Sequence, residues 1–183
     1  MQILRFLHQP CCRISSGRCL AFWHRCDDRQ LMRCLKWIVI AIATGVAGWA
    51  TGNGILNLII WLLGPSAAIN FSGYHREITP LLIFLATVFG PVTESLAVWV
   101  LVWLAQSKLG LGHVRTSLAT GAAMVILHGI SWASLAVLPT FAMHAAIMFS
   151  AKLRRRSGSG YLIIVGAHSL QNLISVVRPL LMA

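Results

Sequence analysis

The sequence contains few charged residues and almost no acidic ones. Of its 183 residues, 10% are charged and only 4 are Asp or Glu, whereas about a quarter of the residues in an ordinary soluble domain are charged. Apolar residues make up 57% of the chain, and its mean hydropathy is +0.77. This composition excludes a water-soluble globule.

The shortage of acidic residues leaves a strongly basic chain. With 15 Lys and Arg, the formal net charge is +11, a balance that would suit a nucleic-acid-binding protein if the basic residues formed one surface. Most of them instead flank long apolar runs. We therefore expect the chain to interact with a lipid bilayer and not with nucleic acid.

Cysteine is absent from every part of the chain except the start. All five cysteines precede the first apolar run, in the most basic part of the sequence: Cys11, Cys12, Cys19, Cys26 and Cys34. Such a flank stays in the cytosol, where thiols remain reduced, and the spacing fits no established zinc pattern. The following apolar run is too long for a removable signal peptide. Residues 1–36 thus form a basic cytosolic segment, or translation starts at Met32 and the cysteines have no role.

Apolar runs long enough to cross a bilayer occur about five times. A transmembrane helix needs about 17 to 25 apolar residues. The expected spans are residues 37–63, 79–105, 117–134, 137–151 and 161–177. The sequence therefore predicts an all-α fold, a polytopic membrane helix bundle of about five transmembrane helices within a membrane domain at 37–183.

The basic residues predict how this bundle is oriented. The first run could instead be two short spans broken at Gly52-Asn53-Gly54. With one span there, 13 basic residues lie on the cytosolic side and 2 outside, whereas splitting it leaves 9 inside and 6 outside. The positive-inside rule favours the first arrangement. We expect an integral membrane protein with a cytosolic N-terminus and the C-terminus outside.

Only one acidic residue lies inside an expected span. Asp27, Asp28 and Glu77 lie in segments expected to be aqueous, which leaves Glu94 in the membrane. An ionisable side chain at the centre of a bilayer costs about 2.5–3.5 kcal/mol on insertion scales, so such residues normally face a cavity or a partner. Glu94 is therefore the first candidate for a functional residue.

Three further polar residues lie at a similar depth. Counted from the expected cytoplasmic ends of their spans, Glu94, His128 and Asn172 are each about 16 Å deep, and His168 is one helical turn nearer the cytosol. His168 and Asn172 share one helix face, because they are four residues apart. We expect these four side chains to line one cavity. His144 matches no such pair and is interpreted as structural or pocket-lining.

This set of side chains suits hydrolysis. A carboxylate can take a proton from water while neutral donors stabilise the oxyanion that develops. Other intramembrane protease designs are excluded by the sequence, because no Asp lies in a span and neither a zinc-binding His-Glu-x-x-His nor a Gly-x-Ser-Gly turn is present. Hydrolysis assisted by a glutamate is the design that remains.

Three motifs then suggest a family. They are Pro91-Val-Thr-Glu94, Met124-Val-Ile-Leu-His128 and His168-Ser-Leu-Gln-Asn172. In order and approximate spacing they resemble the motifs Pro-x-x-Glu-Glu-x-x-x-Arg, Phe-x-x-x-His and His-x-x-x-Asn of the CPBP family. That family includes the CAAX prenyl endopeptidases and bacterial relatives linked to bacteriocin processing or self-immunity. The resemblance covers about residues 79–177.

The resemblance implies a role for each residue. Glu94 and His128 would activate the water, and His168 and Asn172 would form the oxyanion site of an intramembrane endopeptidase that needs no cofactor. Its substrate would be a peptide or protein with a membrane-embedded or C-terminal cleavage site. Zinc held by Glu94, His128 and His168 is the open alternative, because two His and one Glu form a known zinc ligand set.

Three departures from the family pattern keep other functions open. Ser95 replaces the second Glu of the first motif, Trp99 replaces its Arg, and Met124 replaces the Phe of the second motif. The main rival is therefore a catalytically inactive membrane interaction or immunity protein with the same fold. A proton-coupled transporter would fit the intramembrane charges, but the sequence lacks the internal repeat of such folds.

Overall fold

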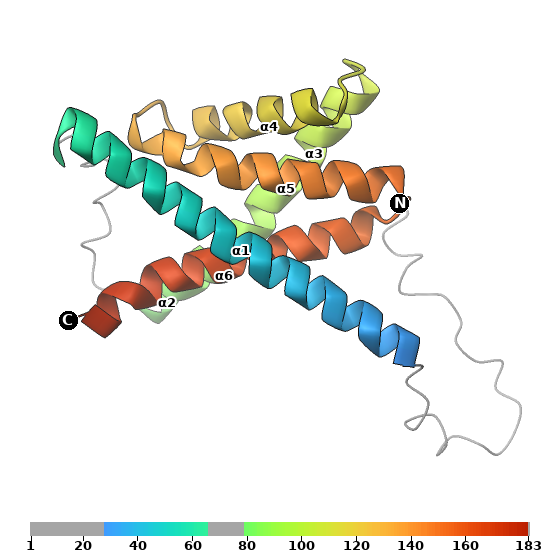
Figure 1. Cartoon of the computed structure of the whole chain (residues 1–183), viewed down its shortest axis with the longest axis horizontal. Helices are drawn as coiled ribbons and strands as arrows, with labels where there is room; N and C mark the ends of the chain where they lie inside the picture. The colour runs from blue at the N-terminus through green and yellow to red at the C-terminus, as the bar shows by residue number, and fades with distance from the viewer. Residues whose placement is uncertain (1–27, 66–78, 183) are drawn as a thin grey trace, which may run out of the picture. The chain divides into compact units, whose positions relative to one another are not determined.

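The computed structural model describes residues 28–65 and 79–182 (Figure 1). It divides into two compact units, Met1–Ile38 and Val39–Ala183. Most of the expected N-terminal segment, with four of the five cysteines, lies outside the described residues. So do Asp27 and the segment that carries Glu77.

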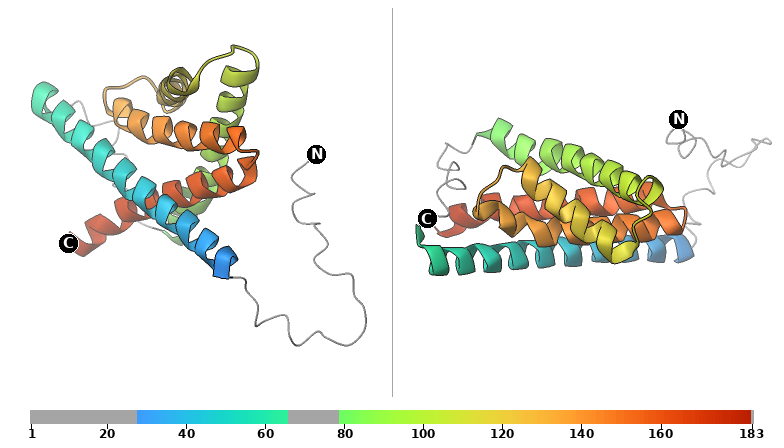
Figure 2. Two further views of the ribbon diagram at one scale, coloured as in Figure 1. Left: turned by 45° about the vertical axis from the view of Figure 1, so that its right-hand side comes forward. Right: turned by 90° about the horizontal axis from the view of Figure 1, so that it is seen from above.

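Every regular element in the described parts of the chain is helical, which confirms the all-α fold. The elements in chain order are α1 (Asp28–Leu63), α2 (Pro80–Phe84), η4 (Leu85–Phe89), α3 (Gly90–Ser107), α4 (His113–Leu127), η5 (Ala133–Val137), α5 (Leu138–Leu153) and α6 (Ser157–Met182). Here η4 is a π-helical turn and η5 is a 3₁₀ helix. Figure 2 shows their arrangement from two further sides.

Four helical segments in the described residues are long and apolar enough to cross a membrane. They are Cys34–Leu63, Pro80–Ser107, Ala133–Leu153 and Ser157–Val177. The second contains α2, η4 and α3, and the third contains η5 and α5. The chain is therefore a membrane protein, and these segments correspond to four of the five expected spans.

The fifth expected span, 117–134, was wrong in its boundaries. Its helix, α4, has 15 residues and a length of about 22 Å, less than the roughly 30 Å of a hydrocarbon core. It ends because Gly129 has a φ of +93°, which breaks the helical hydrogen-bond pattern. The apolar residues that follow belong to η5 and lead into the next helix.

Helices α4 and α5 form an antiparallel pair. At one end, His113 Nε2 lies 3.2 Å from the carbonyl oxygen of Ala146. Towards the other end, a Cβ built at Gly121 would lie 3.0 Å from the carbonyl oxygen of Leu138, so the helices are in close backbone contact there. Figure 1 shows the two helices next to each other, and Figure 2 shows that they cross at an angle.

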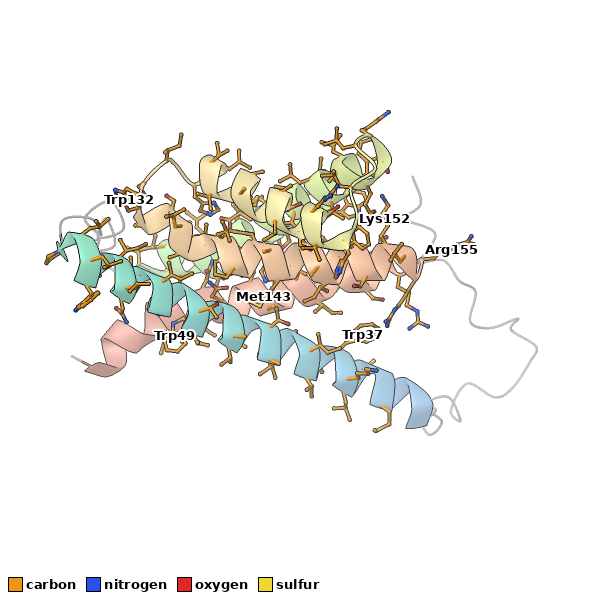
Figure 3. All side chains as sticks on the ribbon, turned by 45° about the horizontal axis from the view of Figure 1, so that its top comes forward. Trp37, Trp49, Trp132, Met143, Lys152 and Arg155 are labelled. Carbon is orange, nitrogen blue, oxygen red and sulfur yellow. The ribbon has the colours of Figure 1, made fainter. Side chains whose placement is uncertain are left out.

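The ends of α3 and α5 meet on one side of the bundle. Lys152 Nζ donates a hydrogen bond to Ser107 Oγ over 3.1 Å. Figure 3 labels Lys152 and Arg155 at this end and Trp132 near the opposite end. The loops that follow α3 and α5 therefore lie on the same side.

Glycines let α1 approach α5 and α6 closely. A Cβ built at Gly45 would lie 2.6 Å from the carbonyl oxygen of Ala167, so only glycine fits there without a backbone shift. One turn further along α1, Thr140 Oγ1 donates to the carbonyl oxygen of Gly48 over 3.3 Å. Small residues at such spacings are typical of helix packing in membranes.

The buried core lies between α3, α4, α5 and α6. It consists of apolar side chains that are at most 8% exposed: Val98, Val102, Met124, Phe141, Ala145, Met148, Phe149 and Ile164. Many large apolar side chains on the outer faces are exposed instead, such as Trp61 and Leu162. Lipid acyl chains would cover such faces in a bilayer.

Candidate active site

Glu94 contacts two histidines from two other helices. Its Oε2 atom lies 3.4 Å from Nε2 of His128 and 3.4 Å from Nε2 of His168. Glu94 belongs to α3, His128 follows the last residue of α4, and His168 belongs to α6. Three of the four residues expected at one depth are therefore in direct contact.

The three side chains differ in their exposure. About 31% of the Glu94 side chain and 28% of the His128 side chain are accessible, compared with 6% for His168. A ligand can thus reach the carboxylate from the side of His128. His168 closes the inner side of the site.

The backbone before Glu94 is distorted in a way that its sequence explains. Pro91 has no N–H to donate to the carbonyl group one turn earlier, and the π-helical turn η4 lies directly before it. Within this turn the N–H of Gly90 bonds the carbonyl oxygen of Leu85. Single π-helical turns inside α-helices often occur at functional sites. Here the turn sets the direction from which α3 presents Glu94.

Asn172 bonds this π-helical turn. Its Nδ2 atom donates to the carbonyl oxygen of Ala86 over 2.8 Å, so the hydrogen bond that the structure gives it is not to Glu94 or to a histidine. A side-chain amide has two N–H bonds, and the second remains for a ligand. Asn172 thus ties α6 to η4 at Ala86, about two helical turns before Glu94, a structural contact that the sequence did not indicate.

His128 is held by the end of its own helix. Its ring Nδ1 lies 2.8 Å from the carbonyl oxygen of Met124, which also accepts the His128 backbone N–H. A carbonyl oxygen only accepts, so Nδ1 carries a proton. In a neutral ring Nε2 is then unprotonated, and this is the atom that faces Glu94. The expectation that His128 lies in the middle of a span was wrong, because α4 ends directly before it.

His168 is buried against aromatic rings. Its ring centroid lies 5.4 Å from that of Phe141, nearly at a right angle, and 5.6 Å from that of His144. In the sequence, His144 matches no other polar residue and is interpreted as structural or pocket-lining, whereas its ring lies next to that of His168. A depth count puts His144 and His168 at the same level, each 7 residues from the expected cytoplasmic ends of their spans at 151 and 161, but it does not tell which faces of the two helices meet.

The donor set contains ligand types that zinc uses. Among the residues that the structure describes, however, no group of three or more His, Cys, Asp or Glu side chains is arranged to hold a metal ion. Glu94, His128 and His168 instead present one carboxylate oxygen to two imidazole nitrogens at the long end of hydrogen-bonding distance. Catalytic contacts of this kind often shorten when substrate binds. The arrangement can take a proton from a water molecule and return it to a leaving group.

No protein-family model matches this chain, and neither curated proteins nor solved structures give a significant match.

Proposed function

We propose that this membrane protein is an intramembrane protease that resembles the CPBP family and hydrolyses a peptide bond with the help of Glu94. The observation that carries the proposal is the contact of one carboxylate oxygen of Glu94 with the Nε2 atoms of His128 and His168. Glu94 lies on α3, His128 at the end of α4 and His168 on α6, and each belongs to a different one of the three family-like motifs.

The proposed reaction uses each side chain for one task. Glu94, assisted by the unprotonated Nε2 of His128, takes a proton from water, and the oxygen of that water attacks the peptide carbonyl carbon. The N–H of His168 Nε2 and the second N–H of Asn172 stabilise the oxyanion. The carbon–nitrogen bond then breaks, and the proton passes to the leaving amine.

The proposed substrate class is the one that the resemblance to the CPBP family implies. It is a peptide or protein with a membrane-embedded or C-terminal cleavage site, in a prokaryotic cytoplasmic membrane. The partly exposed side chains of Glu94 and His128 give such a segment access to the carboxylate. The site needs no metal in this proposal, so a chelator is expected to leave cleavage unchanged.

The departures from the family pattern bear on the rival function, an inactive interaction or immunity protein. Ser95 is completely buried on α3, and Trp99 packs against the apolar core. Neither residue supplies an atom to the contacts between Glu94 and the two histidines. The contact of Glu94 with the two histidines therefore forms without the second Glu and the Arg of the family pattern, which is compatible with retained catalysis.

A comparison of peptide termini in cells tests the proposal and names the substrate. Membranes containing the wild-type chain or Glu94→Gln at equal levels are compared for new protein C-termini and N-termini. Paired termini from one cleaved bond are expected only with the wild type, and Glu77→Gln serves as a control that removes the same charge elsewhere. Identical termini in all three samples would contradict a protease function.

A further inference from the structure

A second buried histidine lies directly behind the candidate active site. His144 on α5 is completely buried, and neither of its ring nitrogens has a hydrogen-bond partner among the described residues. Its ring lies against the rings of His168 and Phe141, with centroids 5.6 Å and 5.9 Å away. Buried polar atoms are almost always paired in native proteins, so two unpaired nitrogens on one buried ring call for an explanation.

His168 has an unpaired nitrogen as well. Its Nδ1 atom is buried and without a partner in the described part of the chain, while its Nε2 atom faces Oε2 of Glu94. An ionised carboxylate only accepts hydrogen bonds, so Nε2 is the nitrogen that should carry the proton. In the neutral ring Nδ1 is then an acceptor, and what it lacks is a donor.

We propose that His144 is a positioning residue that donates a ring N–H to Nδ1 of His168. This bond fixes the His168 tautomer whose Nε2–H points at Glu94, because the proton on one ring nitrogen is set by the bond that the other makes. One imidazole supplies the donor and the other the acceptor, so two unpaired buried atoms satisfy each other. His144 thereby acts through His168 and does not touch the substrate.

The packing of α5 and α6 puts the two rings within reach. A ring-to-ring hydrogen bond of about 3 Å would place two imidazole centroids only slightly closer than the 5.6 Å observed. One turn along the same interface, Gln171 Nε2 donates to Thr140 Oγ1 over 3.3 Å. The two helices already exchange a polar contact there, so a small side-chain rotation completes the bond.

This inference deepens the proposed function, because an oxyanion donor at His168 Nε2 requires this tautomer. Its structural part can be tested separately. The nitrogen chemical shifts of ¹⁵N-histidine-labelled protein in lipid nanodiscs distinguish a protonated from an unprotonated ring nitrogen. The His168 signal, assigned by its loss in His168→Gln, is expected to show a protonated Nε2 and a hydrogen-bonded, unprotonated Nδ1. A proton on Nδ1 in the wild type would overturn the proposal, whatever the behaviour of any variant.

Two variants separate a hydrogen bond from simple packing. His144→Leu keeps much of the bulk and removes the donor, so His168 is expected to lose its single tautomer. His144→Gln keeps an N–H and is expected to preserve it. His113→Leu, which removes a histidine that bonds Ala146 away from the site, is the matched control. An unchanged His168 signal in His144→Leu would overturn the proposal.

Kinetics give a second readout once a cleaved substrate is known. His144→Leu is expected to lower kcat about tenfold or more, as losses of outer-shell partners do, with KM unchanged and with recovery in His144→Gln. A change in KM alone, or equal losses in both variants, would mean that His144 only fills space. If the wild type cleaves nothing, the proposed function fails, while the nitrogen spectra still decide the role of His144.

Discussion

At the scale of single residues, the energetic problem is a carboxylate in a membrane helix. Placing Glu94 there costs about 2.5–3.5 kcal/mol on insertion scales, and apolar neighbours on α3 do nothing to offset this cost. Two imidazole rings lie 3.4 Å from the Glu94 carboxylate, and the N–H of His168 Nε2 offsets part of this cost, because a carboxylate only accepts hydrogen bonds. The His128 ring donates its Nδ1 proton to the carbonyl oxygen of Met124. Its Nε2 atom can therefore exchange a proton with Glu94 or with water.

Asn172→Ala tests the oxyanion role of the amide. Turnover is expected to fall by roughly 10²–10³, the usual loss for one oxyanion donor. Thermal stability should also fall, since the carbonyl oxygen of Ala86 loses its partner at a cost of about 1–3 kcal/mol. Ser175→Ala, on an exposed part of the same helix, should change neither quantity. Wild-type turnover in Asn172→Ala would refute the oxyanion role and leave Asn172 a purely structural residue.

The sequence predicts the depth of the site residues in the membrane, and this depth groups some of them correctly. Counting residues from the ends of apolar runs placed Glu94, His128 and His168 within about one helical turn in depth. It also placed Asn172 at the depth of Glu94 and His168 one turn away, whereas Glu94 contacts His168 and Asn172 bonds Ala86. Side-chain partners could not be found in this way. The bond from Asn172 to Ala86 depends on a π-helical turn, and the pairing of His144 with His168 depends on the rotation of two helices about their axes. Neither the π-helical turn nor the rotation of the helices changes the hydropathy of the sequence, so hydropathy could not predict these contacts.

At the scale of elements, the early end of α4 is the feature that shapes the site. Residues 128–132 are not helical, and most of them are exposed, with Ile130 at 91%. The apolar run 117–134 gave no sign of this break, because hydropathy averages over the turn at Gly129. The helix end is what places His128 against Glu94.

Close packing of α1 is testable with two glycines of one helix. Gly45→Ala is expected to lower the midpoint of thermal unfolding, because its Cβ would lie 2.6 Å from a backbone carbonyl oxygen and overpacking costs about 1–3 kcal/mol. Gly54→Ala meets nothing within 4 Å and gains helix propensity, so its midpoint should stay or rise. Equal shifts in the two variants would show that α1 does not pack as described.

At the scale of the whole chain, the structure gathers basic loops at one end of the Val39–Ala183 unit. The bond from Lys152 to Ser107 joins the loop regions after α3 and α5, which carry Lys108 and Arg154–Arg156. This arrangement supports a cytosolic position for both loops under the positive-inside rule. A cytosolic position of both loops requires the chain to cross the membrane through α4. Because α4 is shorter than a hydrocarbon core, residues 128–132 would add the missing length, up to about 3.3 Å each.

A reporter fused after Ala183 tests this orientation. The five crossings expected from the sequence place it outside, and a second reporter inserted after Leu109 should register in the cytosol. Alkaline phosphatase activity for the first and fluorescence for the second would show the two locations. A cytosolic signal from the C-terminal reporter would reverse the positions of the loops and require the first expected span, 37–63, to be split into two short spans.

The measurement that tests the central claim most directly is cleavage by purified protein in lipid nanodiscs. A membrane-embedded peptide identified from the cellular termini is incubated with the wild type, Glu94→Gln and Glu77→Gln. We predict that the wild type and Glu77→Gln cleave at similar rates, while Glu94→Gln binds the peptide with nearly normal affinity and does not cleave it, because an amide cannot act as the base. Cleavage by Glu94→Gln at the wild-type rate would contradict the claim that the contact of Glu94 with the two histidines is a hydrolytic site.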